Sequence, residues 1–264
     1  MRAAKTTAVL ACLLLLAAGC TSAGAAGGGT HSAAPSARPC QLKVVGQGLT
    51  VTAKKDLRRG DGWWGLPIDT DEVWYGFEVK NTCDKVATDT TVSVDALDAS
   101  GKPVLYTTTY KPLGYAPNVL PNVQPGQTVG YGGYFVNRPT SDGTTAPHYD
   151  VHAVKSVKVH LSNTAFRDVD QFDKWARPKV TNLSVSSHAT NRLWTVSFTV
   201  SATGSGPLHN PAAFALFRSR SGSVVSSQGL DSEGFKLGRH TVRLAVPAGA
   251  DPATTTVSVY EHPR

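Results

Sequence analysis

The sequence is poor in charged residues, methionine and cysteine. Only 17% of its 264 residues are charged and 41% are hydrophobic, which argues against a wholly disordered chain. A single Met, with few Leu beyond the first twenty residues, argues against a helical bundle. The net charge of +7, from 26 basic and 19 acidic residues, is too mild to indicate a nucleic-acid partner.

Most familiar enzyme motifs are also absent. The sequence has no G-x-S-x-G, G-x-x-x-x-G-K-[ST], H-E-x-x-H or S-x-x-K, and no G-x-G-x-x-G that opens a helix. No C-x-x-C pair is present for metal or redox chemistry. We therefore expect a non-enzymatic protein with no catalytic residues and no cofactor.

Two clusters of possible metal ligands lack the geometry of a metal site. His148, His152 and His160 form one histidine cluster, but on a strand residues four apart lie about 13 Å from each other, too far to share a zinc ion unless a loop around His148 bends them together. The acidic group Asp69–Glu72 lacks the ordered pattern and the glycine of a calcium loop. We expect surface histidines, a solvated acidic loop and no metal.

The one long apolar run lies at the N-terminus. Arg2 and Lys5 precede an apolar run over 8–18, which is shorter than the roughly 20 residues of a membrane span and is typical of a secretory signal. The run ends in Leu-Ala-Ala-Gly before Cys20, and this order resembles the end of a bacterial lipoprotein signal.

That resemblance implies that residues 1–19 are removed and that Cys20 is lipidated. The acyl chains would hold the protein at the extracytoplasmic face of the cell membrane. The alternative is cleavage near Ala23-Gly24-Ala25, which discards Cys20 and gives a secreted protein. Residues 20–39 contain no aliphatic side chain larger than Ala after the cysteine, and they predict a flexible linker with a reach of about 25 Å.

The remaining cysteines predict one disulfide. Cys12 lies inside the signal and Cys20 is assigned to the lipid, which leaves Cys40 and Cys83. Two cysteines in an exported chain are most simply paired, and the long loop that they close corresponds to about 4 kcal/mol of stabilisation.

Short stretches of alternating apolar residues predict β-strands. In 73–81 the side chains of Val73, Tyr75, Phe77 and Val79 share one face, while Glu78 and Lys80 share the other, which predicts a half-buried strand. Similar alternation occurs in 42–51, 90–96, 128–136 and 154–161. The stretch 168–176 predicts a short helix or an acidic turn.

The second half of the sequence repeats the first. Trp194, Val196, Phe198 and Val200 match Val73, Tyr75, Phe77 and Val79, and Ala213, Ala215 and Phe217 fall on Val92, Val94 and Ala96. Further on, Thr241-Val242 matches Thr128-Val129, and Val257 and Val259 match Val157 and Val159. The pattern predicts an all-β fold of two tandem immunoglobulin-like antiparallel β-sandwiches, at 40–166 and 178–264, joined by a linker at 167–177.

Each copy also carries a short motif. Residues 214–218 (FALFR), followed by a glycine turn at Gly222, resemble the extracellular FxLYD domain. The first copy keeps an aspartate and the turn at Gly101 but lacks the leading aromatic residue, and its 120–127 stretch resembles that family's proline-glycine turn. The resemblance implies a surface module and no particular reaction.

Aromatic residues of the first copy predict a ligand-binding site. Trp63 and Trp64 lie between two glycines, and Tyr106, Tyr110 and Tyr115 lie in a segment that the second copy lacks. Rigid amphipathic rings beside small polar residues are typical of binding loops. The alternative is that these rings pack over the end of the core.

These observations lead to one functional hypothesis and two alternatives. We expect a non-catalytic, membrane-anchored surface lipoprotein that binds a protein or a cell-envelope ligand through loops of the first sandwich. One alternative is a structural or assembly component of the envelope that acts through its sheet edges. The other is a glycan-binding accessory module.

Overall fold

Alternating apolar residues form antiparallel strands throughout most of the described chain. The computed structural model describes residues 39–52, 72–107, 111, 113–135, 149–172, 176–187, 193–203, 208, 211–230 and 236–261. The predicted all-β sandwich class is confirmed, since the only helices among these residues are the 3-10 turns Val169–Phe172 and Pro252–Thr254. No helix in the described ranges has the length and hydropathy needed to cross a membrane.

The first half contains two three-stranded sheets. One is ordered β1-β2-β6, with β1 at Leu42–Thr52, β2 at Glu72–Asn81 and β6 at Thr128–Phe135. The other is ordered β5-β4-β7, with β5 at Gly114–Val119, β4 at Thr91–Leu97 and β7 at Ser156–Ser162. A two-stranded ladder pairs β3 (Val86–Thr88) with β8 (Ala165–Arg167).

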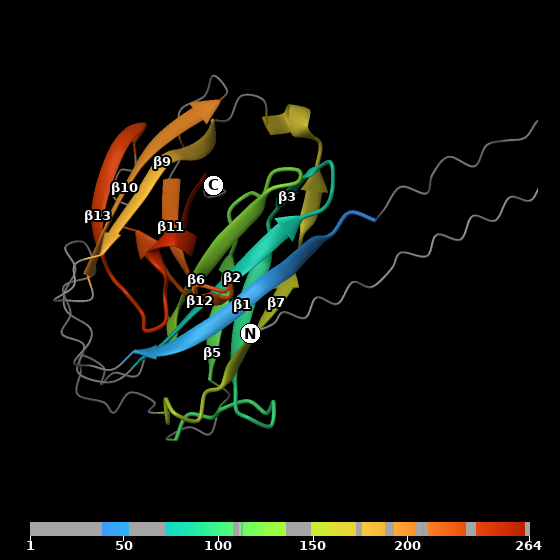
Figure 1. The fold of residues 1–264 in the computed structure, drawn as a ribbon. Coiled ribbons are helices and arrows are strands. Elements are labelled where there is room, and N and C mark those ends of the chain that lie inside the picture. Colours follow the sequence, from blue (N-terminus) through green and yellow to red (C-terminus); the bar gives the residue numbers. More distant parts are fainter. Residues whose placement is uncertain are drawn as a thin grey trace, which may run out of the picture. The chain divides into compact units, whose positions relative to one another are not determined.

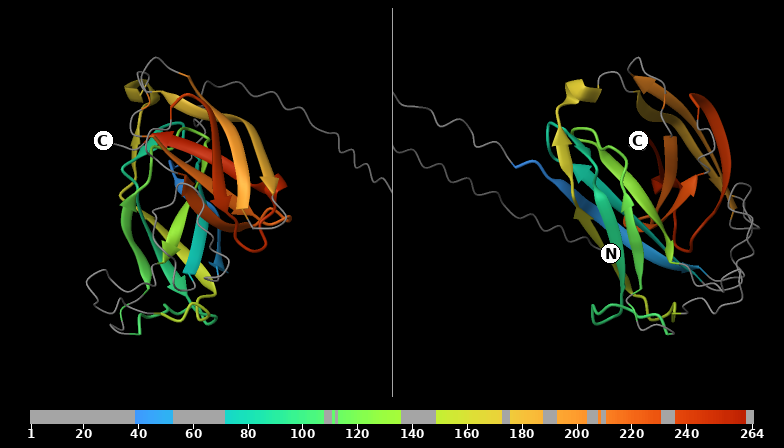
Figure 2. Two further views of the ribbon diagram at one scale, coloured as in Figure 1. Left: turned by 90° about the vertical axis from the view of Figure 1, so that its left-hand side faces the viewer. Right: turned by 180° about the vertical axis from the view of Figure 1, so that it is seen from behind.

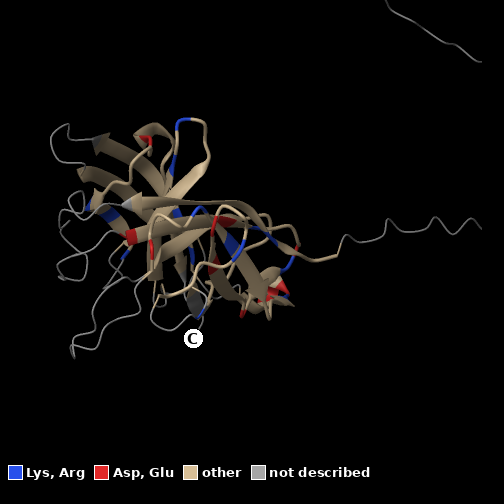
Figure 3. Cartoon of the chain, turned by 90° about the horizontal axis from the view of Figure 1, so that it is seen from below, with Lys and Arg blue, Asp and Glu red and all other residues tan. Residues whose placement is uncertain are grey.

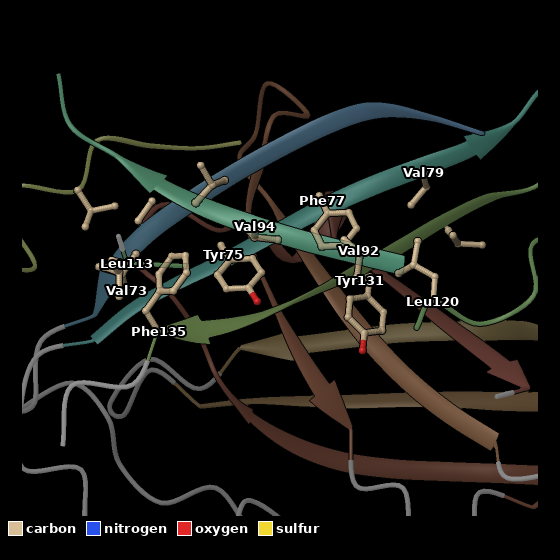
Figure 4. Close-up of a cluster of buried hydrophobic side chains, with 14 of the residues drawn as sticks. Val73, Tyr75, Phe77, Val79, Val92, Val94, Leu113, Leu120, Tyr131 and Phe135 are labelled. Carbon is tan, nitrogen blue, oxygen red and sulfur yellow. The ribbon is translucent and has the colours of Figure 1, made fainter. Parts of the chain in front are cut away.

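A hydrophobic core fills the space between these two sheets. Val73, Tyr75, Phe77 and Val79 of β2 face Val92 and Val94 of β4, and all are buried. Figure 4 shows these side chains with Tyr131 and Phe135 of β6. The prediction for this face of β2 is therefore confirmed.

The second half has the same strand order as the first. One sheet is ordered β13-β10-β9, with β9 at Arg177–Ser187, β10 at Leu193–Thr203 and β13 at Gly238–Ala245. The other is ordered β12-β11-β14, with β11 at Pro211–Arg218, β12 at Val224–Leu230 and β14 at Thr256–Glu261 (Figure 1). The predicted division into two domains with a linker stays a prediction.

Strand pairing corrects two details of the predicted repeat. Gly76 pairs with Gly132, and the matching Ser197 pairs with Thr241, so Thr241 corresponds to Gly132 and not to Thr128. Likewise Val94 pairs with Val159 and Ala215 with Val257, so Val257 corresponds to Val159 and not to Val157. Both displacements are even, because an even slip keeps every apolar side chain on its correct face and is invisible to an alternation pattern.

The predicted disulfide is confirmed. Cys40, just before β1, is bonded to Cys83, just after β2, at a sequence separation of 43 residues. The bond joins the same ends of two strands that are already paired through Leu42 and Asn81. It thus joins the open end of the β1–β2 pair, opposite the end where Thr52 pairs with Glu72.

The second face of β2 corrects another prediction. The strand is buried on both faces from Glu72 to Phe77, so a half-buried strand is wrong for this stretch. The β12-β11-β14 sheet lies against the outer face of the β1-β2-β6 sheet, and both belong to the unit Arg38–Arg264 (Figure 1; Figure 2). The outer face of β2, which was predicted to face solvent, is therefore covered by a sheet of the second half.

A row of glycines makes this close packing possible. Gly48, Gly76 and Gly132 lie side by side across β1, β2 and β6. A Cβ atom at Gly76 would lie 2.6 Å from the backbone carbonyl carbon of Ser226 in β12. Another backbone can approach so closely only at positions that have no Cβ atom.

Polar and aromatic contacts fix the two halves together beside the glycine row. Arg218 of β11 forms an ion pair with Glu78 of β2, and both side chains are largely buried. The Tyr260 hydroxyl donates a hydrogen bond to the carbonyl of Gly130, and burial raises the pKa of this phenol, so it remains a donor. The rings of Phe214 and Tyr131 lie 4.3 Å apart.

Candidate functional site

Several strand ends meet at one end of the first sandwich, here called the loop end. Thr52 pairs with Glu72, and Val73 pairs with Phe135, so β1 ends, β2 begins and β6 ends together. Figure 4 places Leu113, which precedes β5, next to Val73 and Phe135. The chain segments 53–71, 108–112 and 136–148 therefore start and finish at the loop end.

The five predicted ligand-binding residues belong to these segments or their borders. Trp63, Trp64 and Tyr110 lie outside the described residues. Tyr115 is described through its backbone, which pairs with Val94 as β5 begins. Tyr106 is half-buried and packs against the core of the first sandwich. Tyr106 and Tyr115 therefore border the loop end, and the role of all five residues in binding stays a prediction.

Tyr106 rests on a second tyrosine that is fixed in place. Its ring meets that of Tyr149 edge-on, with the centroids 6.2 Å apart. Tyr149 is buried and its hydroxyl donates a 2.8 Å hydrogen bond to the carbonyl of Phe135. Burial raises the pKa of both phenols, most strongly that of Tyr149, so Tyr149 stays protonated and keeps this bond. The half-exposed ring of Tyr106 therefore has a rigid support.

The outer side of β2 carries a second ring pair at the same end. Trp74 is 3% exposed, pairs with Tyr134 of β6, and has its ring centroid 6.0 Å from that of Tyr134. The Trp74 indole donates a 3.1 Å hydrogen bond to the carboxylate of Glu72. Glu72 is 0% exposed, so the prediction of a solvated acidic loop is wrong for this residue. A buried carboxylate requires such donors, and the indole N–H supplies one.

The described histidines do not form a metal site. His160 lies 2.8 Å from the Asp95 carboxylate on the outer face of the β5-β4-β7 sheet. His152 is exposed in the turn before β7, and His148 lies outside the described residues. In the part of the chain that the structure describes, one group has metal-ligand spacing, namely Cys40, Cys83 and Asp84, and its two sulfurs are joined to each other.

The loop end combines exposed ring surface with a fixed base. Half-exposed Tyr106 and Tyr134 lie over buried Tyr149 and Trp74. Rings held in one orientation lose little conformational entropy when they contact a ligand, so they suit stacking or edge contacts with sugars and protein side chains. Trp74, Tyr134 and Tyr149 were not predicted as part of this site. They could have been found from the sequence as aromatic residues that lie within three positions of the segments 53–71 and 136–148.

Comparisons with known proteins show a distant likeness to a solved structure. No family model matches the chain, and no curated protein matches it. The solved structure of β-glucuronidase from Ruminococcus gnavus is similar at 14% sequence identity and a TM-score of 0.21. The match covers 85% of this chain and 42% of that one, so this chain spans less than half of the enzyme's length. At this TM-score the likeness supports no inference about function.

Proposed function

We propose that this protein is a non-catalytic lipoprotein of the extracytoplasmic membrane face that binds a protein or glycan of the cell envelope at the loop end. The observation that carries the proposal is the pair of ring contacts at this end, Tyr106 with Tyr149 and Tyr134 with Trp74. The Cys40–Cys83 disulfide supports an exported protein, because such bonds persist in oxidising compartments. The lipid on Cys20 would keep the loop end near its ligand in the envelope.

The proposal predicts that two tryptophans carry most of the binding. In a Trp63→Ala/Trp64→Ala variant we expect at least tenfold weaker sedimentation with isolated cell envelopes, since buried tryptophans at interface centres often contribute 2 kcal/mol or more each. The measurement is the fraction of purified protein that pellets as the envelope concentration rises. Thermal unfolding of the same samples reports whether the fold is intact.

A matched control removes apolar surface elsewhere. Val45 and Val119 are 51% and 40% exposed, and they lie away from the loop end. A Val45→Ala/Val119→Ala variant should therefore pellet like the wild type. Unchanged binding of the tryptophan variant would reject the loop-end proposal and favour the sheet-edge alternative.

A second prediction concerns the membrane anchor. In cells that make a Cys20→Ala variant, we expect the protein in the medium instead of the membrane fraction, because the acyl chains that supply the membrane affinity are lost. A Cys12→Ala variant is the control, since Cys12 lies within the removed segment and should leave the anchoring unchanged. Immunoblots of the two fractions give the readout. Membrane retention of the Cys20→Ala protein would contradict the anchor.

A further inference from the structure

We propose that the outer face of the β13-β10-β9 sheet binds a linear anionic polymer of repeating phosphate groups. This surface belongs to strands of the second half of the chain, whereas the loop end is formed by strand ends of the first half. It is therefore an additional binding function, which does not depend on the lipid anchor or on Trp63 and Trp64. The sheet is opposite the β12-β11-β14 layer, and its other face closes the second core (Figure 2).

The charges on this sheet have one sign. Its three strands carry Arg177, Lys179, Arg239 and Arg243 and contain no Asp or Glu. Lys179, Arg239 and Arg243 are exposed, and the inward positions of Val180, Val242 and Leu244 place all four cations on the outer face. Charged residues are otherwise sparse along the described strands, most of which are tan in Figure 3.

The cations border a row of hydroxyl groups. The outward side chains of β10 from Thr195 to Thr203 are all Ser or Thr, and they recur about every 6.7 Å along the strand. The cationic strands β9 and β13 flank β10 and so lie about 10 Å apart. A chain of repeating phosphates and hydroxyls can follow this row while the flanking cations neutralise its charge.

Hydrogen bonds hold part of the row in a fixed geometry. The hydroxyls of Ser197 and Thr241 lie 3.0 Å apart and join β10 to β13. Ser201 donates a 3.4 Å hydrogen bond to the carbonyl of Lys179 on β9. In the Ser197–Thr241 contact one hydroxyl donates to the other, so the second keeps a proton that it can donate to a phosphate oxygen.

The composition of the face favours a polymer over a lipid bilayer. Surfaces that lie in a bilayer interface present rings or aliphatic side chains that insert among the acyl chains. On this face Leu183 occupies a bulge of edge strand β9, while the central row is hydroxylated. Cationic and hydroxyl groups on a flat surface complement an extended, hydrated anionic chain.

The test measures binding of the full chain to inorganic polyphosphate and to poly(glycerol phosphate) by sedimentation or fluorescence titration. In a Lys179→Gln/Arg239→Gln/Arg243→Gln variant we expect roughly tenfold weaker binding to both polymers at about 0.1 M salt, and a shallower salt dependence. The control is Lys43→Gln/Lys102→Gln/Lys155→Gln, which removes the same charge at exposed positions of the first half. If the triple variant of the face does not fold, a Lys179→Gln/Arg239→Gln variant replaces it.

The outcomes separate this surface from its alternatives. Loss in the face variant with retention in the control supports the proposal. Equal loss in both variants shows that net charge alone drives binding, and it overturns the proposal, as does wild-type protein that binds neither polymer. Binding to phosphatidylglycerol vesicles without binding to either polymer also overturns it. The Trp63→Ala/Trp64→Ala variant should bind both polymers normally, which keeps this test independent of the loop end.

Discussion

A Gly76→Ala variant should be less stable than the wild type by about 3 kcal/mol or more in urea unfolding at equilibrium. The added Cβ atom would lie 2.6, 2.7 and 2.9 Å from three backbone atoms of Ser226 and Ser227. Backbone atoms of a paired strand cannot move aside as a flexible side chain can, so the methyl group must push β12 off the β1-β2-β6 sheet. Overpacking of this kind costs about 1 to 3 kcal/mol even where side chains absorb part of it.

The matched control is Gly229→Ala in β12 itself. A Cβ atom there would meet the nearest heavy atom, Cε1 of Phe214, at 3.6 Å, which is ordinary contact. Removing a glycine where space exists stabilises a protein by up to about 1 kcal/mol through the unfolded state. We therefore expect no loss of stability for Gly229→Ala. Equal stability of the two variants would mean that β12 does not pack on the glycine row.

The Cys40–Cys83 bond should contribute about as much to the free energy of unfolding as the Gly76→Ala substitution removes. Replacing both cysteines by Ala should lower the free energy of unfolding by about 4 kcal/mol, because a closed loop with a 43-residue separation restricts the unfolded chain. Urea unfolding under oxidising conditions measures this difference.

Reduction of the wild type provides an internal control for that measurement. A reducing agent should shift the wild-type midpoint towards that of the double variant and leave the variant unchanged. Persistence of the full wild-type stability after complete reduction would contradict the entropic contribution assigned to this bond.

The sequence predicts the inner faces of the sheets well and the outer ones poorly. Val73, Tyr75, Phe77 and Val79 alternate with polar residues, and a period of two is sufficient to assign them to a core. Glu78 on the opposite face has the appearance of a solvent-facing residue, yet it pairs with Arg218 across an interface. The available signal was the glycines of three strands, at alternate positions in β1 and β6 and single in β2, which pattern rules treat as weak strand formers.

The sequence indicates the aromatic residues proposed for binding, but it does not indicate the buried residues that support the loop end. Trp63, Trp64 and the tyrosines stand out because rings beside glycine and proline are typical of loops. Tyr149 and Glu72 do not stand out, because their roles depend on the distant carbonyl of Phe135 and on the indole of Trp74. A hydrogen bond between residues separated in sequence leaves no periodic trace, so composition and spacing cannot reveal it.

The glycine row also makes the contact between the two halves directional. The β12-β11-β14 sheet lies on the outer face of the β1-β2-β6 sheet, where Gly76 and Gly132 leave room for Ser226 and Ser227 of β12. The paired positions that correspond to them in the second half are Ser197 and Thr241, whose hydroxyls lie 3.0 Å apart. Side chains at these positions leave no such room, so the outer face of the β13-β10-β9 sheet cannot receive another sheet in the same close contact.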